Sequence, residues 1–298
     1  MRSRDVVELL VLSVLWGAAY LFMRAAVPAF GPAPLIALRM AIAVAVLLPL
    51  LLWRGGSAQL VAHPVALLVL GVAFTALPFL LLGFAAQHLT AGLLSVLNAT
   101  APLFAALLAH FVYHERLGLW RGAGLVIGFA GVALLTAGSV SFKSAGGLAA
   151  VGAVLFTSAL WSLGANFTRH RLGGMDNLAL TVGSLAVASL ALTPMAMITW
   201  PAEPPPLRAW IEVLFLGVAS SGLGFLLYYR LLRRIGTVRA MSVTFLNPVV
   251  ALISGALYLG EAITWQTLAG AAVVLAGTAL SLGLWPGSRV TAATAASR

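Results

Sequence analysis

The sequence predicts an all-α membrane protein, with ten transmembrane helices arranged as two inverted five-helix repeats around a central cavity. Three observations lead to this fold class. Of the 298 residues, 62% are hydrophobic and only 8% are charged, whereas soluble proteins carry about 25% charged residues. The hydrophobic residues come in runs of about 20, the length that a helix needs to cross a bilayer. The second half of the chain also resembles the first half.

Ten hydrophobic runs, bounded by Arg, Pro and Gly residues, predict ten spans. They cover residues 6–27, 33–53, 64–86, 92–112, 119–138, 147–168, 178–200, 208–230, 240–259 and 265–285. The first run is longer than the hydrophobic region of a cleaved signal peptide, so we expect it to remain as a span. The connections are short, and we expect no soluble domain between the spans.

The basic residues indicate how the chain is oriented in the membrane. With the N-terminus placed inside, most of the 17 Lys and Arg residues fall on the inner side, and Arg24, Arg39, Lys143 and Arg208 are the exceptions. Because short cytoplasmic loops are enriched in Lys and Arg, we expect both termini in the cytoplasm and the chain in the cell (inner) membrane.

Composition also excludes several kinds of function. The basic residues are scattered singly or in small groups, so they form no continuous surface for a nucleic-acid backbone. The chain has no Cys, which rules out disulfides and thiolate chemistry. No Walker A pattern is present, so ATP is not expected to drive the protein. We predict no metal site and no cofactor, and the expected partners are the lipid bilayer and a small-molecule substrate.

An internal repeat relates the two halves of the chain. A shift of 145 or 146 residues matches Leu70–Ala73 with Leu216–Ala219, Pro102 with Pro248, Glu115 with Glu261, and Trp16 with Trp161. We predict a first repeat over residues 1–143 and a second over 144–298, the latter with a short cytoplasmic tail. Five spans per repeat place the two repeats in opposite orientations. Inverted repeats are typical of transporters that bind substrate near the midplane, between the repeats.

Several of these residues also carry a resemblance to a known family. The stretch Leu15–Tyr20, Pro102 with Glu115–Leu117, and the counterpart Asn247–Pro248 with Leu259–Glu261 resemble the EamA-type repeats of the drug/metabolite transporter superfamily. The resemblance covers essentially the whole chain, although His114 stands where Gly commonly precedes the Glu. The chain is most similar to bacterial exporters of amino acids and metabolites, including the aromatic amino-acid group. The resemblance implies a basket-like bundle with a central cavity and alternating access.

Candidate substrate contacts are polar and aromatic residues that recur within spans at helical spacing, several of them at positions matched by the repeat. The predicted substrate-binding residues are Trp16, Tyr20, Thr75, Phe79, Asn98, Trp161, Asn166, Ser221, Tyr228, Thr244 and Asn247. Trp and Tyr can instead lie at the membrane interface, and Ser, Thr and Asn can bond across packed helices. Both interpretations stay open for each residue.

Charged residues and prolines within spans add two further expectations. Arg39 could contact a substrate carboxylate, or it could be anchored to carbonyls or lipid headgroups. Pro78, Pro102 and Pro248 each remove a helical hydrogen bond, so they are candidate hinges or static kinks. The seven acidic residues fall in loops or at span ends, which favours neutral or zwitterionic cargo over lipophilic dications.

The sequence therefore predicts a secondary transporter that exports amino acids or similar neutral or zwitterionic metabolites by alternating access. An exporter of hydrophobic drugs or lipid-like compounds is the alternative. An intramembrane enzyme is a remote alternative, because no nucleophile with a base and no HExxH pattern is present. Small residues such as Gly124, Gly128 and Gly277 predict close helix contacts, either within the bundle or between protomers of a homodimer. The oligomeric state, monomer or homodimer, stays open.

Overall fold

The computed structural model describes residues 3–112, 114, 118–139, 145–235 and 243–282, and within them every regular element is helical. Eight helical segments of at least 18 residues are apolar enough to cross a membrane, and the shorter apolar helices Val243–Leu259 and Trp265–Ser281 add to them. The predicted fold class, an all-α membrane protein with many spans, is therefore confirmed.

The helices follow the order of the predicted spans. The first half contains α1 (Ser3–Phe30), α2 (Pro32–Trp53), the short α3 (Ala58–Ala62), α4 (Pro64–Gly71), η1 (Val72–Ala76), α5 (Leu77–Ala85), α6 (Ala91–Asn98), α7 (Ala101–Phe111) and α8 (Leu119–Ser139). The second half contains α9 (Ala145–Arg171), α10 (Asn177–Ile198), α11 (Leu207–Leu214), η2 (Phe215–Leu223), α12 (Gly224–Ile235), α14 (Val243–Leu259) and α15 (Trp265–Ser281).

Three predicted spans are not simple α-helices. Spans three and eight each contain a π-helical segment, η1 and η2, and span four is broken between α6 and α7. Glu115, Lys143, the proposed boundary between residues 143 and 144, residues 240–242 of span nine and residues 283–285 of span ten lie outside the described residues.

Local sequence explains where several helices begin. The Asp176 carboxylate accepts hydrogen bonds from the amides of Leu178 and Ala179, and the Thr264 hydroxyl accepts one from Thr267. These are N-cap interactions, which satisfy amides that have no partner inside the helix. α2 instead begins with Pro32 at its first position, directly after Gly31 at φ 76°, a backbone angle that suits glycine.

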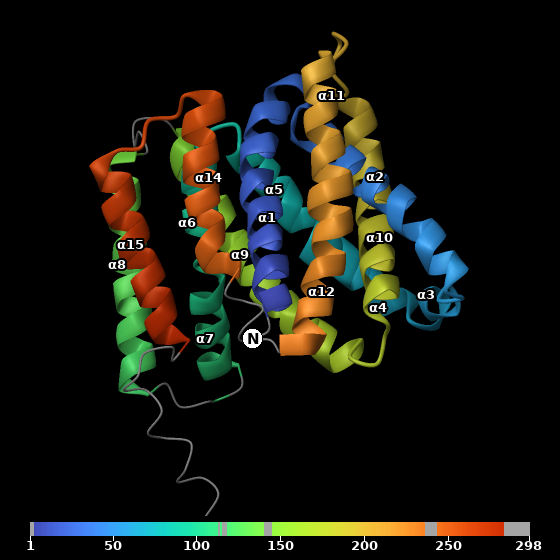
Figure 1. Ribbon diagram of the computed structural model, residues 1–298, viewed down its shortest axis with the longest axis horizontal. Coiled ribbons are helices and arrows are strands. Elements are labelled where there is room, and N and C mark those ends of the chain that lie inside the picture. The colour runs from blue at the N-terminus through green and yellow to red at the C-terminus, as the bar shows by residue number, and fades with distance from the viewer. Residues whose placement is uncertain (1–2, 113, 115–117, 140–144, 236–242, 283–298) are drawn as a thin grey trace, which may run out of the picture.

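The first helix of each half packs into the other half. α1 contacts α11, η2, α12 and α14 of the second half, while α9 contacts α4, η1, α5, α6 and α7 of the first half. Figure 1 shows α1 in the middle of the bundle, with the α8–α15 pair at one edge and α2, α4 and α10 at the other. The two halves are thus interlocked through their first helices.

Contacts near the centre of the bundle occur in matched pairs, one in each half. The Trp16 ring lies 5.7 Å from Phe225, and Trp161 lies 5.5 Å from Phe79, between ring centroids. The same residue shift relates η1 to part of η2. Glycines against a crossing helix are matched as well, Gly71 against Val187 and Ser184 O, and Gly217 against Ile42 and Arg39 O. These contacts are arranged as an internal repeat requires.

The glycine-rich spans five and ten pack against each other within the chain. A Cβ on Gly124, Gly131 or Gly277 would collide with the backbone of the facing helix in the α8–α15 pair. Of the two interpretations left open for these glycines, the described contacts support packing within the bundle.

Candidate functional site

Arg39 is a buried cation in the middle of the bundle. Its residue exposure is 4%, and it lies about two turns from the start of α2. Its Nε donates to Ser221 Oγ at 2.9 Å and its Nη2 donates to Ser220 Oγ at 3.2 Å, both in η2. The guanidinium carbon also lies 4.6 Å from the centre of the Phe79 ring. All of these contacts are made with neutral groups.

The charge of Arg39 lacks compensation among the described residues. Its Nη1 is buried without a hydrogen-bond partner, and none of the ion pairs between described residues includes Arg39. Removing an ion from water costs several kcal/mol in a protein interior unless a counter-charge is present. Serine hydroxyls and an aromatic face recover only part of that cost. The arrangement therefore leaves a binding position for an anion at Nη1.

A second polar pair joins two other helices, α1 and α6. The Asn98 side-chain amide donates to Tyr20 Oη at 2.6 Å and joins the end of α6 to the middle of α1. The Asn98 carbonyl oxygen, Oδ1, is buried without a partner, as are Asn247 Oδ1 and Ser95 Oγ. Asn247 is on α14, whose backbone meets α1 at Gly17, one turn before Tyr20. Buried carbonyl oxygens of this kind are acceptors for a donor that the described residues do not supply.

Aromatic side chains surround the two polar groups. The Trp16 indole donates to the Ser220 carbonyl oxygen at 3.1 Å and packs on Tyr228, with the ring centroids 5.1 Å apart. Phe79 separates Arg39 from Trp161. Each of the following predicted residues contacts another of them, Arg39 or α1: Trp16, Tyr20, Phe79, Asn98, Trp161, Ser221, Tyr228 and Asn247.

Other predicted residues make contacts within their own helical segments. The Thr75 hydroxyl donates to Leu70 O at 2.9 Å, and the Asn166 amide donates to Ser162 O at 3.1 Å. Thr244 lies in the first turn of α14, three residues before Asn247. Their role as substrate contacts stays a prediction.

Two residues of the second half were missed or misjudged in the sequence. The Ser220 hydroxyl accepts from Arg39 and its backbone carbonyl accepts from Trp16. Ser220 was not among the predicted residues, because no sequence pattern indicated its π-helical segment. Glu212 was expected in a loop or at a span end; it is 2% exposed on α11, where it accepts from Arg208 Nε at 3.0 Å. Its charge is therefore already paired.

The candidate hinge prolines occupy different settings. Pro102 follows the break between α6 and α7, where Ala99 and Ala101 expose carbonyls that accept from Thr278 and Ser162 on other helices. Pro78 is at the start of α5, directly after η1, whereas Pro248 is inside the continuous helix α14.

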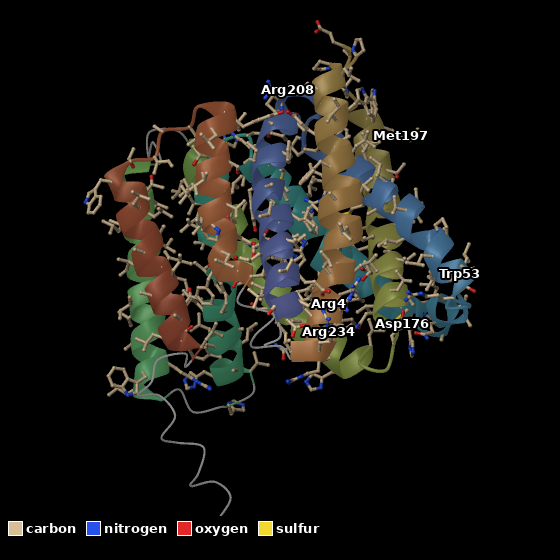
Figure 2. The ribbon with its side chains drawn as sticks, viewed as in Figure 1. Arg4, Trp53, Asp176, Met197, Arg208 and Arg234 are labelled. Carbon is tan, nitrogen blue, oxygen red and sulfur yellow. The ribbon has the colours of Figure 1, made fainter. Side chains whose placement is uncertain are left out.

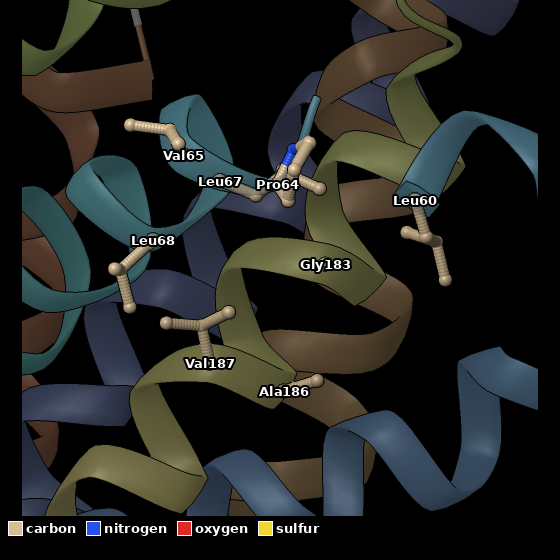
Figure 3. A pocket seen from close by; sticks show the side chains of 8 residues that line it. All are labelled: Leu60, Pro64, Val65, Leu67, Leu68, Gly183, Ala186 and Val187. Carbon is tan, nitrogen blue, oxygen red and sulfur yellow. The ribbon is translucent and has the colours of Figure 1, made fainter. Parts of the chain in front are cut away.

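An apolar groove of about 430 Å³ lies apart from this cluster (Figure 3). Its lining comes from α3, α4 and α10 and consists of Leu60, Pro64, Val65, Leu67, Leu68, Gly183, Ala186 and Val187. None of the predicted substrate-binding residues lines it. Since its walls carry no charged side chain, it suits a hydrocarbon chain better than a zwitterion.

Comparisons with known proteins agree with this architecture. The family model described as EamA-like transporter family matches residues 6–137 and 148–283. An uncharacterized transporter of Archaeoglobus fulgidus is 26% identical over 262 residues, covering 88% of this chain and 92% of that protein. The uncharacterized inner membrane transporter YedA of Escherichia coli K12 is 26% identical over 309 residues, covering 98% and 97%. One solved structure shares the fold, with a TM-score of 0.68 and 20% identity over 94% of this chain and 96% of that chain.

Proposed function

The chain belongs to the EamA-like transporter family, and from that premise we propose that it exports amino acids or similar small zwitterionic metabolites by alternating access. As a member of this family it is a multi-pass membrane transporter. We further propose that this cargo is exported across the inner membrane and that both termini lie in the cytoplasm. The two repeats of the proposal cover residues 1–143 and 144–298. The proposal also assigns the predicted cluster around Arg39 to substrate binding.

The unpaired Nη1 of Arg39 is the observation that carries the cargo assignment. A guanidinium binds a carboxylate through short, charge-assisted hydrogen bonds. Ser220 and Ser221 hold the other two guanidinium nitrogens, so the planar group is fixed with one nitrogen left to bind substrate. A carboxylate at Nη1 would supply the counter-charge that this buried cation lacks.

The unpaired oxygens of Asn98 and Asn247 support a zwitterion over a simple anion. An ammonium group has three donors and no acceptor, so amide oxygens without partners can bind it. Trp16, Phe79 and Trp161 supply aromatic surface nearby. The drug or lipid exporter is less well supported, because an apolar cargo would leave Arg39 and these oxygens without partners.

Alternating access also needs a place where helices bend. Among the three candidate prolines, Pro102 has the strongest support because span four is broken just before it. The two π-helical segments add possible bending points, since π-helical turns are often found at functional sites.

Counterflow in proteoliposomes tests the cargo assignment. The panel contains amino acids, the amines that result from their decarboxylation, and the corresponding acids without the amino group. We expect exchange of the amino acids, weaker inhibition by the acids and little inhibition by the amines. If folded protein exchanges amines as well as amino acids, or exchanges no carboxylate-bearing solute, the assignment is wrong.

Replacing Asn98 with Leu is expected to weaken binding of the ammonium end of the substrate and to leave binding of its carboxylate end nearly unchanged. The change removes the Oδ1 acceptor and the bond to Tyr20, so the KM for amino acids should rise about tenfold, equivalent to roughly 1.4 kcal/mol. The inhibition constant of the acids without an amino group should change much less.

Thr136→Val is the matched control for Asn98→Leu, because Thr136 is buried in α8 and bonds only to its own helix. It should leave KM unchanged. An equal loss for amino acids and for the acids, measured by the same counterflow assay, would contradict an ammonium contact at Asn98.

A further inference from the structure

Charged side chains hold α1 at both of its ends. We define the N-terminal latch as Asp5 and Glu8 of α1 with Arg230 and Arg234 of α12. We define the C-terminal latch as Arg24 of α1, Glu261 of the α14–α15 loop and the backbone amide of Ala91. Sixteen residues separate Glu8 from Arg24, so the two latches are about 24 Å apart along α1.

The N-terminal latch joins the beginning of α1 to the end of α12. Glu8 Oε1 lies 3.5 Å from Arg230 Nη1, and Glu8 Oε2 pairs with Arg234 Nη2. Asp5 Oδ1 lies 3.5 Å from Arg234 Nη1. Both acidic side chains are largely buried, with exposed fractions of 8% and 12%. Figure 2 shows Arg4 and Arg234 next to each other at this end, and Arg208 at the opposite end of the bundle.

The C-terminal latch joins the other end of α1 to two further segments. Both oxygens of Glu261 accept from the Ala91 amide, at 3.2 and 3.0 Å, and Arg24 Nε lies 3.9 Å from Oε1. Arg24 Nη1 also donates to the Ala86 carbonyl at 2.9 Å. Burial raises the pKa of the Glu261 carboxyl, while the Ala91 amide and Arg24 lower it. Burial is the largest of these effects and leaves the pKa of Glu261 raised, while its partners in the first half of the chain favour the charged form.

Each latch connects the first half of the chain to the second half. Asp5, Glu8, Arg24 and Ala91 belong to the first half, and Arg230, Arg234 and Glu261 belong to the second. The candidate binding site lies between the two latches. Arg39 and Ser95 are 4% and 1% exposed, whereas Trp16, Asn98 and Trp161 are only partly buried. The two halves are thus joined at both ends of α1, with the most deeply buried polar groups of the candidate site between the two latches.

We propose that the two latches are the gates of the transport path, and that each opens only while the other is closed. Opening the N-terminal latch separates α1 from α12 and exposes the site to one side of the membrane. Opening the C-terminal latch separates α1 and α6 from the α14–α15 loop and exposes the site to the other side. The inference rests on the transport function proposed above, but its test needs no substrate.

Ion pairs at the edge of the bundle are suited to this role: the carboxylates are 8–14% exposed, and Arg24, Arg230 and Arg234 are 32–48% exposed. Their attraction is largely offset by the cost of removing the charges from water, so a pair can close a gate without making the closed state too stable to open. Loss of an arginine removes a partner from a largely buried carboxylate, which is unfavourable, and loss of a carboxylate removes the attraction that joins the two halves. A single neutralising substitution should therefore shift the protein towards the state in which that gate is open.

Labelling of a single engineered cysteine tests the proposal, because the chain contains no native Cys. Ser95→Cys is the reporter: Ser95 is buried on α6, on the same face as Asn98, and its hydroxyl has no hydrogen-bond partner. A membrane-impermeant maleimide is added to right-side-out or inside-out vesicles. In the otherwise unchanged chain we expect slow labelling from both sides.

Neutralising each latch should accelerate labelling from one side only. Glu261→Gln, and independently Arg24→Gln, should increase the rate at least tenfold from one side. Asp5→Asn combined with Glu8→Gln should give a similar increase from the opposite side. Arg208→Gln is the control, because Arg208 and Glu212 pair within α11 and do not join the two halves. It should leave the rates unchanged.

Three outcomes would overturn the proposal: acceleration from the same side by both kinds of variant, acceleration from both sides by either kind, or no acceleration in protein that still elutes as a folded species. The labelling result is independent of cargo. Gates confirmed in this way would stand even if the proteoliposome assay rejected amino acids as substrates.

Discussion

Arg39→Gln is expected to lower the transport of carboxylate-bearing solutes by about 100-fold or more. Truncating one partner of a buried, hydrogen-bonded charge pair costs 2–5 kcal/mol, and a factor of ten corresponds to about 1.4 kcal/mol. Glutamine can still bond to Ser221, but it brings no charge to the position where the carboxylate is expected. Arg39→Lys should recover only part of the activity, because an ammonium cannot reproduce the planar arrangement of three nitrogens.

The stability of the same variant distinguishes a binding arginine from a structural one. Without substrate, Arg39 has a buried nitrogen with no partner, which is a cost to the folded state. We therefore expect the thermal midpoint of purified Arg39→Gln protein to stay the same or rise while transport is lost. A clear fall in the midpoint, with transport retained, would mean that Arg39 serves packing and not cargo.

The sequence was sufficient to predict the membrane spans, because long apolar runs have few other ways to fold. It also predicted which residues occupy equivalent positions in the two halves. Trp16 and Trp161 were matched by the repeat, and in the structure each packs against a phenylalanine from the other half, Phe225 and Phe79. A composition rule and a residue shift were therefore enough to indicate the spans and the matched aromatic contacts between the halves.

The sequence could not show how Arg39 is held. Hydroxyls, aromatic faces, carbonyls and headgroups all bind a guanidinium, and choosing among them requires the distance between α2 and η2. Ser221 was predicted as a substrate contact, and in the structure its hydroxyl accepts from Arg39. The neighbouring Ser220 hydroxyl also accepts from Arg39, and both serines lie in the π-helical segment η2. Backbone geometry of this kind depends on tertiary packing and is not encoded in a periodic pattern.

The first helix of each half contributes both to the packing of the bundle and to the candidate site. α1 and α9 each pack mainly against the opposite half, so the same contacts that stabilise the bundle form the walls of the candidate site. Close backbone approach between α1 and α14 keeps this region compact, and it depends on the glycine next to Trp16 in the sequence. A large loss of stability is therefore expected from a side chain at that glycine.

Gly17→Val is expected to lower the free energy of unfolding by about 3 kcal/mol or more, because overpacking of a tight contact forces the backbone to move. A Cβ at position 17 would lie 2.5 Å from Val250 Cβ and 2.9 Å from the Asn247 carbonyl oxygen. Detergent-solubilised protein would be compared with the unchanged chain by thermal unfolding. Gly152→Val is the control, since a Cβ at position 152 inside α9 meets no atom within 4 Å.

A double-mutant cycle shows whether this loss comes from the α1–α14 contact itself. Gly17→Ala and Val250→Gly each damage the interface, one by overpacking and the other by leaving a cavity, but together they exchange the small residue between the two helices. Because the nearest atoms to the new Cβ are the side-chain carbons of Val250, the double variant should be more stable than the sum of the single effects predicts, by 0.5–3 kcal/mol for residues in contact. Strictly additive losses would mean that α1 and α14 do not approach at this point, and the position of the Asn247 backbone against Gly17 would then be wrong as well.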